Sequence, residues 1–171
     1  SVKDIGALLD WITTQPNLDA SRVAVIGGSY GGYMSLACMT NYNDRLKCGI
    51  DLFGISNFVS FLKNTSAYRV DLRRAEYGDE RDPKMAEYFQ KISPLTNIKN
   101  ITKPMLIYQG ENDPRVPLSE SEQMVEALKQ NGAPVSYIRA KDEGHGIAKK
   151  ANRDYTYSSI SWFLKKYLVG E

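Results

Sequence analysis

The most constraining feature of this sequence is a short β-branched run that leads directly into a glycine-rich turn around a serine. Residues 22–26 (RVAVI) show no polar–apolar alternation, which is typical of a strand buried on both faces of a parallel sheet. Residues 27–31 (GGSYG) match the pattern G-x-S-x-G, and an apolar stretch that begins at Tyr30 predicts a helix. This order of strand, glycine-rich turn and helix predicts a sharp turn that exposes the Ser29 hydroxyl. The glycines two residues before and after Ser29 prevent clashes where the strand and the helix come close.

A phosphate-binding turn is the alternative interpretation of the same glycines. Backbone N–H groups at the start of a helix bind anions, and glycine-rich turns often precede such helices. Residues 27–32 (GGSYGG) lack the lysine of a P-loop and the spacing of G-x-G-x-x-G. The pattern therefore favours a nucleophilic serine.

The rest of the chain alternates between predicted strands and predicted helices. Further strands are expected at residues 48–53, 104–109 and 135–139. Helices are expected at residues 2–12, 30–39, 119–130 and around 160–168, with a helical excursion above the sheet at 57–92 that turns at 79–83. Ser119 and Glu122 form an S-x-x-E capping box, and Asn131-Gly132 is typical of a helix end. Because the crossovers are long, the pattern predicts an α/β fold: a parallel sheet of about four strands with helices on both faces.

Composition excludes several classes of partner. With 22 Lys+Arg against 20 Asp+Glu, the net charge of +2 is too small to indicate nucleic acid binding. No apolar run is long enough to span a membrane, and the first residues show no secretory signal, so a cytoplasmic protein is expected. Cys38 and Cys48 lie in apolar stretches and are expected as buried free thiols. Without CxxC or HxxxH spacing, no metal or other cofactor is expected.

A single histidine is the candidate base for Ser29. A serine hydroxyl is a poor nucleophile unless a base accepts its proton. The only histidine, His145, lies in residues 143–146 (EGHG), a loop directly after the predicted fourth strand. Because parallel sheets place their sites in loops at the carboxyl ends of strands, His145 is expected near Ser29.

Three carboxylates are candidates to orient His145. A catalytic imidazole needs a carboxylate on its other ring nitrogen, which holds the tautomer and stabilises the cation. Asp113 follows the third strand in residues 110–114 (GENDP), whereas Glu111 and Asp142 are the competitors and Asp142 is expected as a solvated loop charge. The order serine, aspartate, histidine along the chain is that of α/β-hydrolases and favours Asp113.

Tyr30 supplies the expected first donor to an oxyanion through its backbone N–H, since it directly follows the serine. The second donor of such folds comes from a loop upstream of the nucleophile strand. Residues 1–21 contain no HGGG-type loop, which is a departure from that pattern.

Three motifs together resemble those of the prolyl oligopeptidase family of serine peptidases. They are GGSYGGYM at residues 27–34, GENDPRVP at 110–117 and EGHG at 143–146. The GGSYGG form is similar to the acylaminoacyl-peptidase and dipeptidyl-aminopeptidase branches, and the resemblance runs from about residue 2 to residue 168. It implies a peptidase that cleaves short peptides through an acyl-enzyme, with Ser29, Asp113 and His145 as the triad.

The resemblance also implies a larger architecture. Family members carry an α/β-hydrolase domain capped by an N-terminal β-propeller, and residues 1–171 resemble only the C-terminal portion of that domain, with the propeller and first strands absent. A tyrosine hydroxyl from the absent portion would be the second oxyanion donor. Ile55, Phe58 and Val116 fall where the family lines its P1 pocket, although ordinary core packing is the alternative. Arg115 is positioned either to touch a substrate carbonyl or to cap its loop.

Two other functions remain open at this point. A carboxylesterase or lipase has the same triad, although the sequence ENDPRVP favours a peptidase. A catalytically inactive fragment is the second alternative, since an apolar strand at residues 22–27 without a neighbour is a template for pairing with another chain. Self-association into a homo-oligomer is expected on that ground.

Overall fold

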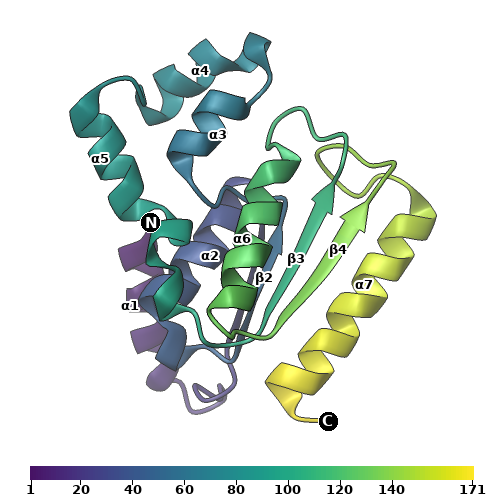
Figure 1. Ribbon diagram of the computed structural model, residues 1–171. Coiled ribbons are helices and arrows are strands. Elements are labelled where there is room, and N and C mark those ends of the chain that lie inside the picture. Colours follow the sequence, from purple (N-terminus) through teal and green to yellow (C-terminus); the bar gives the residue numbers. More distant parts are fainter.

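The computed structural model describes residues 1–171, and its centre is a sheet of four parallel strands in the order β1-β2-β3-β4 (Figure 1). The strands are β1 (Ala24–Gly28), β2 (Cys48–Leu52), β3 (Met105–Gly110) and β4 (Val135–Ala140). Gly28 pairs with Leu52, which in turn pairs with Tyr108, so the carboxyl ends of the first three strands lie at one level. This is the edge of the sheet where an α/β fold places its loops.

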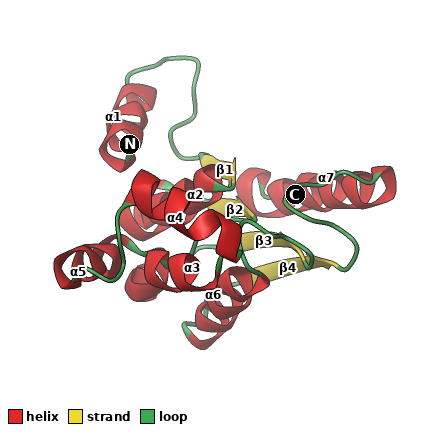
Figure 2. Ribbon diagram, turned by 90° about the horizontal axis from the view of Figure 1, so that it is seen from above, coloured by secondary structure: helices red, strands yellow, loops and turns green.

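Helices cover both faces of the sheet (Figure 2), as the sequence pattern predicts. The helices are α1 (Val2–Thr13), α2 (Tyr30–Asn41), α3 (Phe58–Asn64), α4 (Ala67–Tyr77), α5 (Pro83–Ile92), α6 (Leu118–Gln130) and α7 (Lys150–Leu164). Two short 3-10 segments, η1 (Asn43–Arg45) and η2 (Pro94–Asn100), and a π-helical segment, η3 (Lys165–Val169), complete the chain. Helices α2 and α6 pack on one face, and α7 packs alone on the other. The expected α/β class is confirmed.

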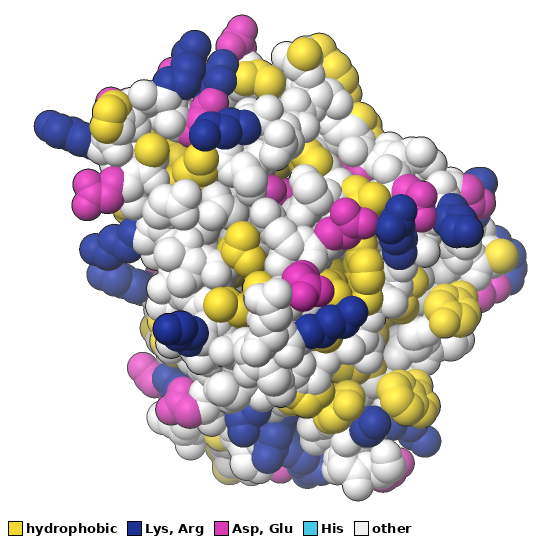
Figure 3. Space-filling view, viewed as in Figure 1, with side chains coloured by type: hydrophobic (Ala, Val, Ile, Leu, Met, Phe, Trp, Pro, Cys, Tyr) yellow, Lys and Arg dark blue, Asp and Glu magenta, His cyan; other side chains and the backbone are white.

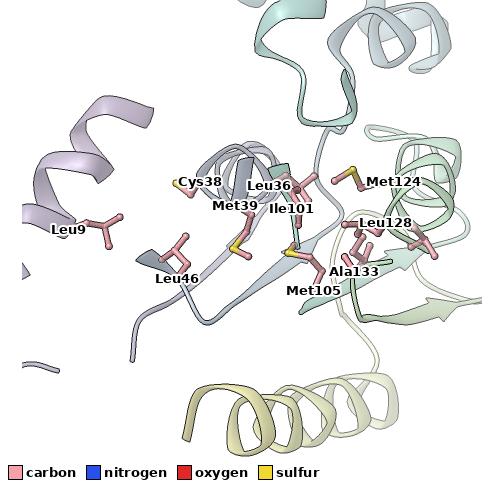
Figure 4. Close-up of a cluster of buried hydrophobic side chains, with 12 residues drawn as sticks. Leu9, Leu36, Cys38, Met39, Leu46, Ile101, Met105, Met124, Leu128 and Ala133 are labelled. Carbon is pink, nitrogen blue, oxygen red and sulfur yellow. The ribbon is translucent and has the colours of Figure 1, made fainter. Parts of the chain in front are cut away.

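Two apolar layers hold the helices to the sheet. On the face under α2 and α6, a cluster of twelve buried side chains includes Leu36, Met39, Met105, Met124 and Leu128 (Figure 4). On the opposite face, Ile160 and Phe163 of α7 pack against Cys48, Ile50 and Leu106. Alternate residues of β3 therefore contribute to both layers, with Met105 and Ile107 in the first and Leu106 in the second, which explains its run of apolar residues.

The excursion between β2 and β3 forms α3, α4 and α5, as predicted for residues 57–92. Asn57 caps α3 by accepting hydrogen bonds from the backbone N–H groups of Val59 and Ser60. Asp82 caps α5 in the same way, and Pro83 occupies the first helical position. These caps fix where the chain turns, so the excursion folds back over the carboxyl ends of the strands.

Two local predictions are wrong. Residues 22–26 were predicted to form a strand buried on both faces, but β1 pairs only with β2 and its Ile26 side chain is 56% exposed. The predicted capping box at Ser119 and Glu122 does not form, because α6 begins at Leu118 after Pro117, without a side-chain cap. Glu122 instead accepts a hydrogen bond from Arg139 of β4.

The surface carries charges of both signs, interspersed on the face shown in Figure 3. Cys38 and Cys48 are buried free thiols, as predicted. None of the helices has the length and apolar character needed to cross a membrane.

Candidate active site

Ser29 occupies a strained turn between β1 and α2. Its backbone has φ 59° and ψ −119°, a conformation that non-glycine residues rarely adopt. The Ser29 N–H donates to the carbonyl of Leu52 at 2.9 Å, and the Ser29 carbonyl accepts from the N–H of Tyr33 at 3.1 Å. Because strand and helix hold the backbone from both sides, the hydroxyl projects away from the turn. Tyr30 then begins α2, where the first N–H groups have no partner within the helix.

The two glycines of G-x-S-x-G are not equivalent. A Cβ at Gly27 would lie 2.2 Å from the carbonyl oxygen of Gly31, so glycine is needed there. A Cβ at Gly31 would meet nothing within 4 Å. The prediction that both glycines prevent clashes is therefore wrong for Gly31 in this chain.

His145 lies beside Ser29, on a loop that returns across the sheet from β4. Its Nε2 atom is 2.9 Å from Ser29 Oγ, and its Nδ1 atom is 2.7 Å from Asp113 Oδ2. A carboxylate only accepts, so Nδ1 carries the proton and the free Nε2 accepts from the serine hydroxyl. The His145 side chain is 10% exposed and that of Asp113 is fully buried. The three residues thus form one continuous hydrogen-bonded row.

Asp113 is held by its own loop. Its Oδ1 accepts from the N–H groups of Arg115 at 2.8 Å and Val116 at 3.0 Å. Its Oδ2 accepts from Gln109 Nε2 at 3.2 Å as well as from His145. These four hydrogen bonds fix the orientation of the carboxylate, so that Oδ2 faces the imidazole.

The competing carboxylates have other partners. Glu111 binds Arg139 of β4 at 2.7 Å. Asp142 binds Lys149 at 2.5 Å and accepts from Asn152, and the hydrogen bonds to these side chains lower the pKa of Asp142. Neither carboxylate contacts His145, so Asp113 alone of the three candidates reaches the imidazole.

The predicted pocket residues lie close to the site but are packed as core. Ile55, Phe58 and Val116 belong to one buried cluster, each 2–3% exposed. Phe58 also lines a cavity of about 940 Å³ between α1, α2, α4 and α5, together with Tyr30 and Tyr77. The Arg115 side chain is exposed, and only its backbone makes hydrogen bonds: its N–H binds Asp113 and its carbonyl accepts from Thr65 Oγ1.

Sequence reasoning missed two residues that position the site. Gln109 is fully buried and donates to Asp113 Oδ2 and to the carbonyl of Val116. Glu143 accepts from the N–H groups of Ala148 and Lys149, which closes the loop that carries His145. The sequence does contain a signal for each residue. Gln109 is a polar residue in an otherwise apolar predicted strand, and Glu143 lies two positions before His145.

Asp51 and Glu120 are two further buried carboxyl groups. Burial raises the pKa of Asp51 to about 7, with Glu120 adding to the increase and the Gly54 N–H opposing it. Burial also raises the pKa of Glu120, whose Oε2 accepts from the N–H groups of Ser56 and Asn57. No group of three His, Cys, Asp or Glu side chains is arranged to hold a metal ion.

Comparison with known proteins identifies the family. The description "Prolyl oligopeptidase family" matches the chain over residues 1–171. The chain belongs to this family. Among curated members, it is 38% identical to "Dipeptidyl peptidase family member 6" of Caenorhabditis elegans, over 98% of this chain and 23% of the relative. It is 36% identical to "Dipeptidyl aminopeptidase BIII" of Pseudoxanthomonas mexicana, over 98% of this chain and 25% of the relative.

Solved structures of peptidases share the fold. A puromycin-hydrolysing peptidase of Mycobacterium tuberculosis superposes with a TM-score of 0.91 at 29% identity, covering 99% of this chain and 25% of that one. The acylaminoacyl peptidase of Pyrococcus horikoshii gives a TM-score of 0.88 at 27% identity, covering 98% of this chain and 28% of that one. The chain thus spans about a quarter of the length of these relatives.

Proposed function

We propose that this chain carries the catalytic triad of a serine peptidase, with Ser29 as nucleophile, His145 as base and Asp113 as the orienting carboxylate. The observation that carries the proposal is the hydrogen-bonded row from Ser29 Oγ through His145 to Asp113 Oδ2. We further propose that residues 1–171 form the C-terminal portion of an α/β-hydrolase peptidase domain. The one-quarter coverage of the relatives supports that assignment.

The proposed reaction is acyl transfer in two stages. Ser29 Oγ attacks the scissile carbonyl while Nε2 of His145 takes its proton, and Asp113 stabilises the resulting imidazolium without itself being protonated. The tetrahedral intermediate collapses as His145 gives that proton to the leaving amine, which leaves an acyl-enzyme on Ser29. A water molecule, deprotonated by His145, then hydrolyses the ester and restores the serine.

Tyr30 is the proposed oxyanion donor. Its N–H stands at the first position of α2, directly after Ser29, where the helix offers it no internal partner. The positive end of the helix dipole adds to this stabilisation of developing negative charge. Removing one such donor costs roughly 10²–10³ in rate in well-studied cases, so the position of α2 matters to the chemistry.

The proposed substrates are short peptides, cleaved near the N-terminus with release of acylaminoacyl or dipeptidyl units. The names of the relatives support this class. Ile55, Phe58 and Val116 are proposed to form an apolar wall for the residue that precedes the scissile bond. The exposed Arg115 is proposed to bind a substrate carbonyl, because its guanidinium has no partner of its own and follows Asp113 by two positions.

Labelling by a fluorophosphonate probe tests the nucleophile directly. We expect the chain to be labelled and Ser29→Ala to remain unlabelled, while Ser158→Ala, at an exposed serine of α7, is labelled like the unaltered chain. Labelling of Ser29→Ala, or none of the unaltered chain, contradicts the proposal.

Chromogenic substrates separate peptidase from esterase activity. Acetyl-aminoacyl and dipeptidyl anilides present an amide, whereas nitrophenyl acetate presents a simple ester. We expect hydrolysis of the amides at a rate that Ser29→Ala abolishes. Ester hydrolysis without amide hydrolysis would assign the chain to the carboxylesterases instead.

A further inference from the structure

Phe53 is one of two non-glycine residues in the chain with positive φ, and the other is Ser29. Its φ of 47° lies in the left-handed region, which an aromatic side chain rarely enters. Strained backbone of this kind persists only where its surroundings fix it, and it gathers at functional sites. Phe53 directly follows β2, whose last residue, Leu52, accepts the hydrogen bond from the N–H of Ser29. One backbone hydrogen bond therefore links the two strained positions, because Ser29 donates it and Phe53 directly follows the residue that accepts it.

The surroundings of Phe53 account for its backbone. Its N–H donates to the carbonyl of Tyr108 at 2.7 Å, which extends the ladder between β2 and β3 by one residue. The next residue, Gly54, lies so close to α2 that a Cβ there would be 2.6 Å from the carbonyl carbon of Gly32. The chain must turn sharply between these two contacts, and the turn falls on Phe53.

This turn directs the Phe53 ring toward the site. The ring centroid is 4.8 Å from that of His145, with an interplanar angle of 55°, and 6.2 Å from that of Tyr108. The ring also occupies the space beside the nucleophile turn, because a Cβ at Gly28 would lie 3.1 Å from it. Phe53 is only half-buried, so it faces the site rather than the interior of the core.

His145 needs such a support because of the path of its loop. The loop leaves β4 at one edge of the sheet and reaches back to Ser29, which follows β1. Glycines flank His145 on both sides, so the local backbone does little to fix the imidazole. Over β3, the Tyr108 hydroxyl donates to the carbonyl of Gly146 at 3.2 Å. Over β2, the Phe53 ring is the aromatic group in contact with the imidazole.

We infer that Phe53 is a positioning residue that acts through His145: its ring is the platform that holds the imidazole between Ser29 and Asp113. The inference rests on the proposed function, in which His145 is the base. A displacement of about 1 Å in a reacting group costs on the order of 10²-fold in rate, so loss of this platform is expected to slow the reaction of Ser29.

Three substitutions at Phe53 separate the role of the ring from that of the fold. Phe53→Leu keeps apolar volume without a ring, and Phe53→Tyr restores the ring. Phe53→Gly removes the ring while accepting the positive φ without strain, so it remains informative if the leucine variant does not fold. Phe163→Leu is the matched control, because Phe163 is a residue of α7 that packs against the other face of the sheet.

The rate of fluorophosphonate labelling is the first readout. We expect Phe53→Leu and Phe53→Gly to react about ten- to a hundredfold more slowly than the unaltered chain, and Phe53→Tyr to react within about threefold of it. Phe163→Leu is expected to melt at a lower temperature and to label normally while folded. Labelling of folded Phe53→Leu at the unaltered rate would overturn the inference.

Proton NMR of His145 is the second readout and needs no activity. The chain has one histidine, so the Nδ1 proton shared with Asp113 gives a single, assignable low-field resonance. We expect this resonance to broaden through solvent exchange in Phe53→Leu and to stay sharp in Phe53→Tyr. An unaltered chain that fails to label, but whose resonance responds in this way, would contradict the proposed function and leave the platform supported. A resonance as sharp in Phe53→Leu as in the unaltered chain would contradict the platform.

Discussion

The Oγ atom of Ser29 lies 2.9 Å from Nε2 of His145, although 116 positions separate the two residues in the chain. Ser29 follows β1 and His145 follows β4, so two intervening strands separate the elements that carry them. The contact exists because the loop after β4 crosses the carboxyl ends of β3 and β2. The site therefore depends on the whole width of the sheet and on what supports that loop.

Asp113→Asn tests the proposed role of Asp113 as the carboxylate that orients His145. An amide that turns its NH2 group toward Nδ1 favours the other imidazole tautomer, in which Nε2 is protonated and no longer accepts from Ser29. We expect a rate loss of about 10⁴ in hydrolysis, the size known for this change in a serine protease, with little change in fold. Asp142→Asn, three residues from His145, is the control and should leave the rate unchanged. A loss below tenfold in Asp113→Asn would argue for a different carboxylate.

Gly27→Ala and Gly31→Ala form a matched pair on either side of Ser29, the proposed nucleophile. The methyl group at position 27 would lie 2.2 Å from the carbonyl oxygen of Gly31, a backbone atom of α2, whereas the methyl group at position 31 enters open space. We expect Gly27→Ala to lose labelling and about 1–3 kcal/mol of unfolding free energy. Gly31→Ala should label normally and gain up to about 1 kcal/mol. Urea unfolding measures both, and equal effects at the two positions would contradict the steric argument.

The sequence predicts the order of elements well because each signal is local. The apolar runs of β2 and β3 and the G-x-S-x-G turn specify their structures without knowledge of distant residues. The order along the chain also indicates Asp113 and His145, since parallel strands bring their carboxyl ends to one edge. The exposed side chain of Ile26 is not indicated by these local signals, because exposure on a sheet face depends on how far the helices extend over β1.

The supports of the site escape sequence reasoning for a related reason. In the sequence, Phe53 is an ordinary apolar residue at the end of a predicted strand. Its positive φ arises only in the folded chain, from the hydrogen bond to Tyr108 and the close approach of Gly54 to Gly32. Gln109 is recognisable as a buried polar residue only when the sheet is assembled around it. Such roles depend on long-range packing, to which periodicity and motif spacing are insensitive.

Asp51→Asn is expected to change how stability depends on pH. Burial raises the Asp51 pKa from an ordinary value of 3.8 to about 7, so between those values the folded chain holds a proton that the unfolded chain releases. The stabilising contribution of the Asp51 proton is therefore fully present below about pH 4. It decreases as the pH rises from about 4 to about 7, and above pH 7 the free energy of unfolding no longer changes through Asp51.

The amide does not titrate, so the variant should gain unfolding free energy relative to the unaltered chain as pH rises across that window. Urea unfolding at pH 4, 6 and 8 measures the difference. Asp142→Asn is the control with the opposite sign, because hydrogen bonds lower the Asp142 pKa and its contribution disappears only in acid. A difference between Asp51→Asn and the unaltered chain that stays constant with pH would show that Asp51 is ionised throughout.

Ile26→Lys tests whether the open edge of β1 drives self-association. β1 pairs with β2 on one side only, and the apolar side chain of Ile26 on this edge strand is 56% exposed. An unpaired strand edge with apolar side chains is a template for another chain, and a lysine on such an edge opposes pairing. We expect sedimentation velocity to show the unaltered chain associating as concentration rises, and Ile26→Lys remaining a monomer.

Leu72→Lys, at a residue of α4 that is 61% exposed, should associate like the unaltered chain. Association that Ile26→Lys leaves undiminished would place the contact elsewhere, and an unaltered chain that stays monomeric at high concentration would show that the edge alone does not drive it.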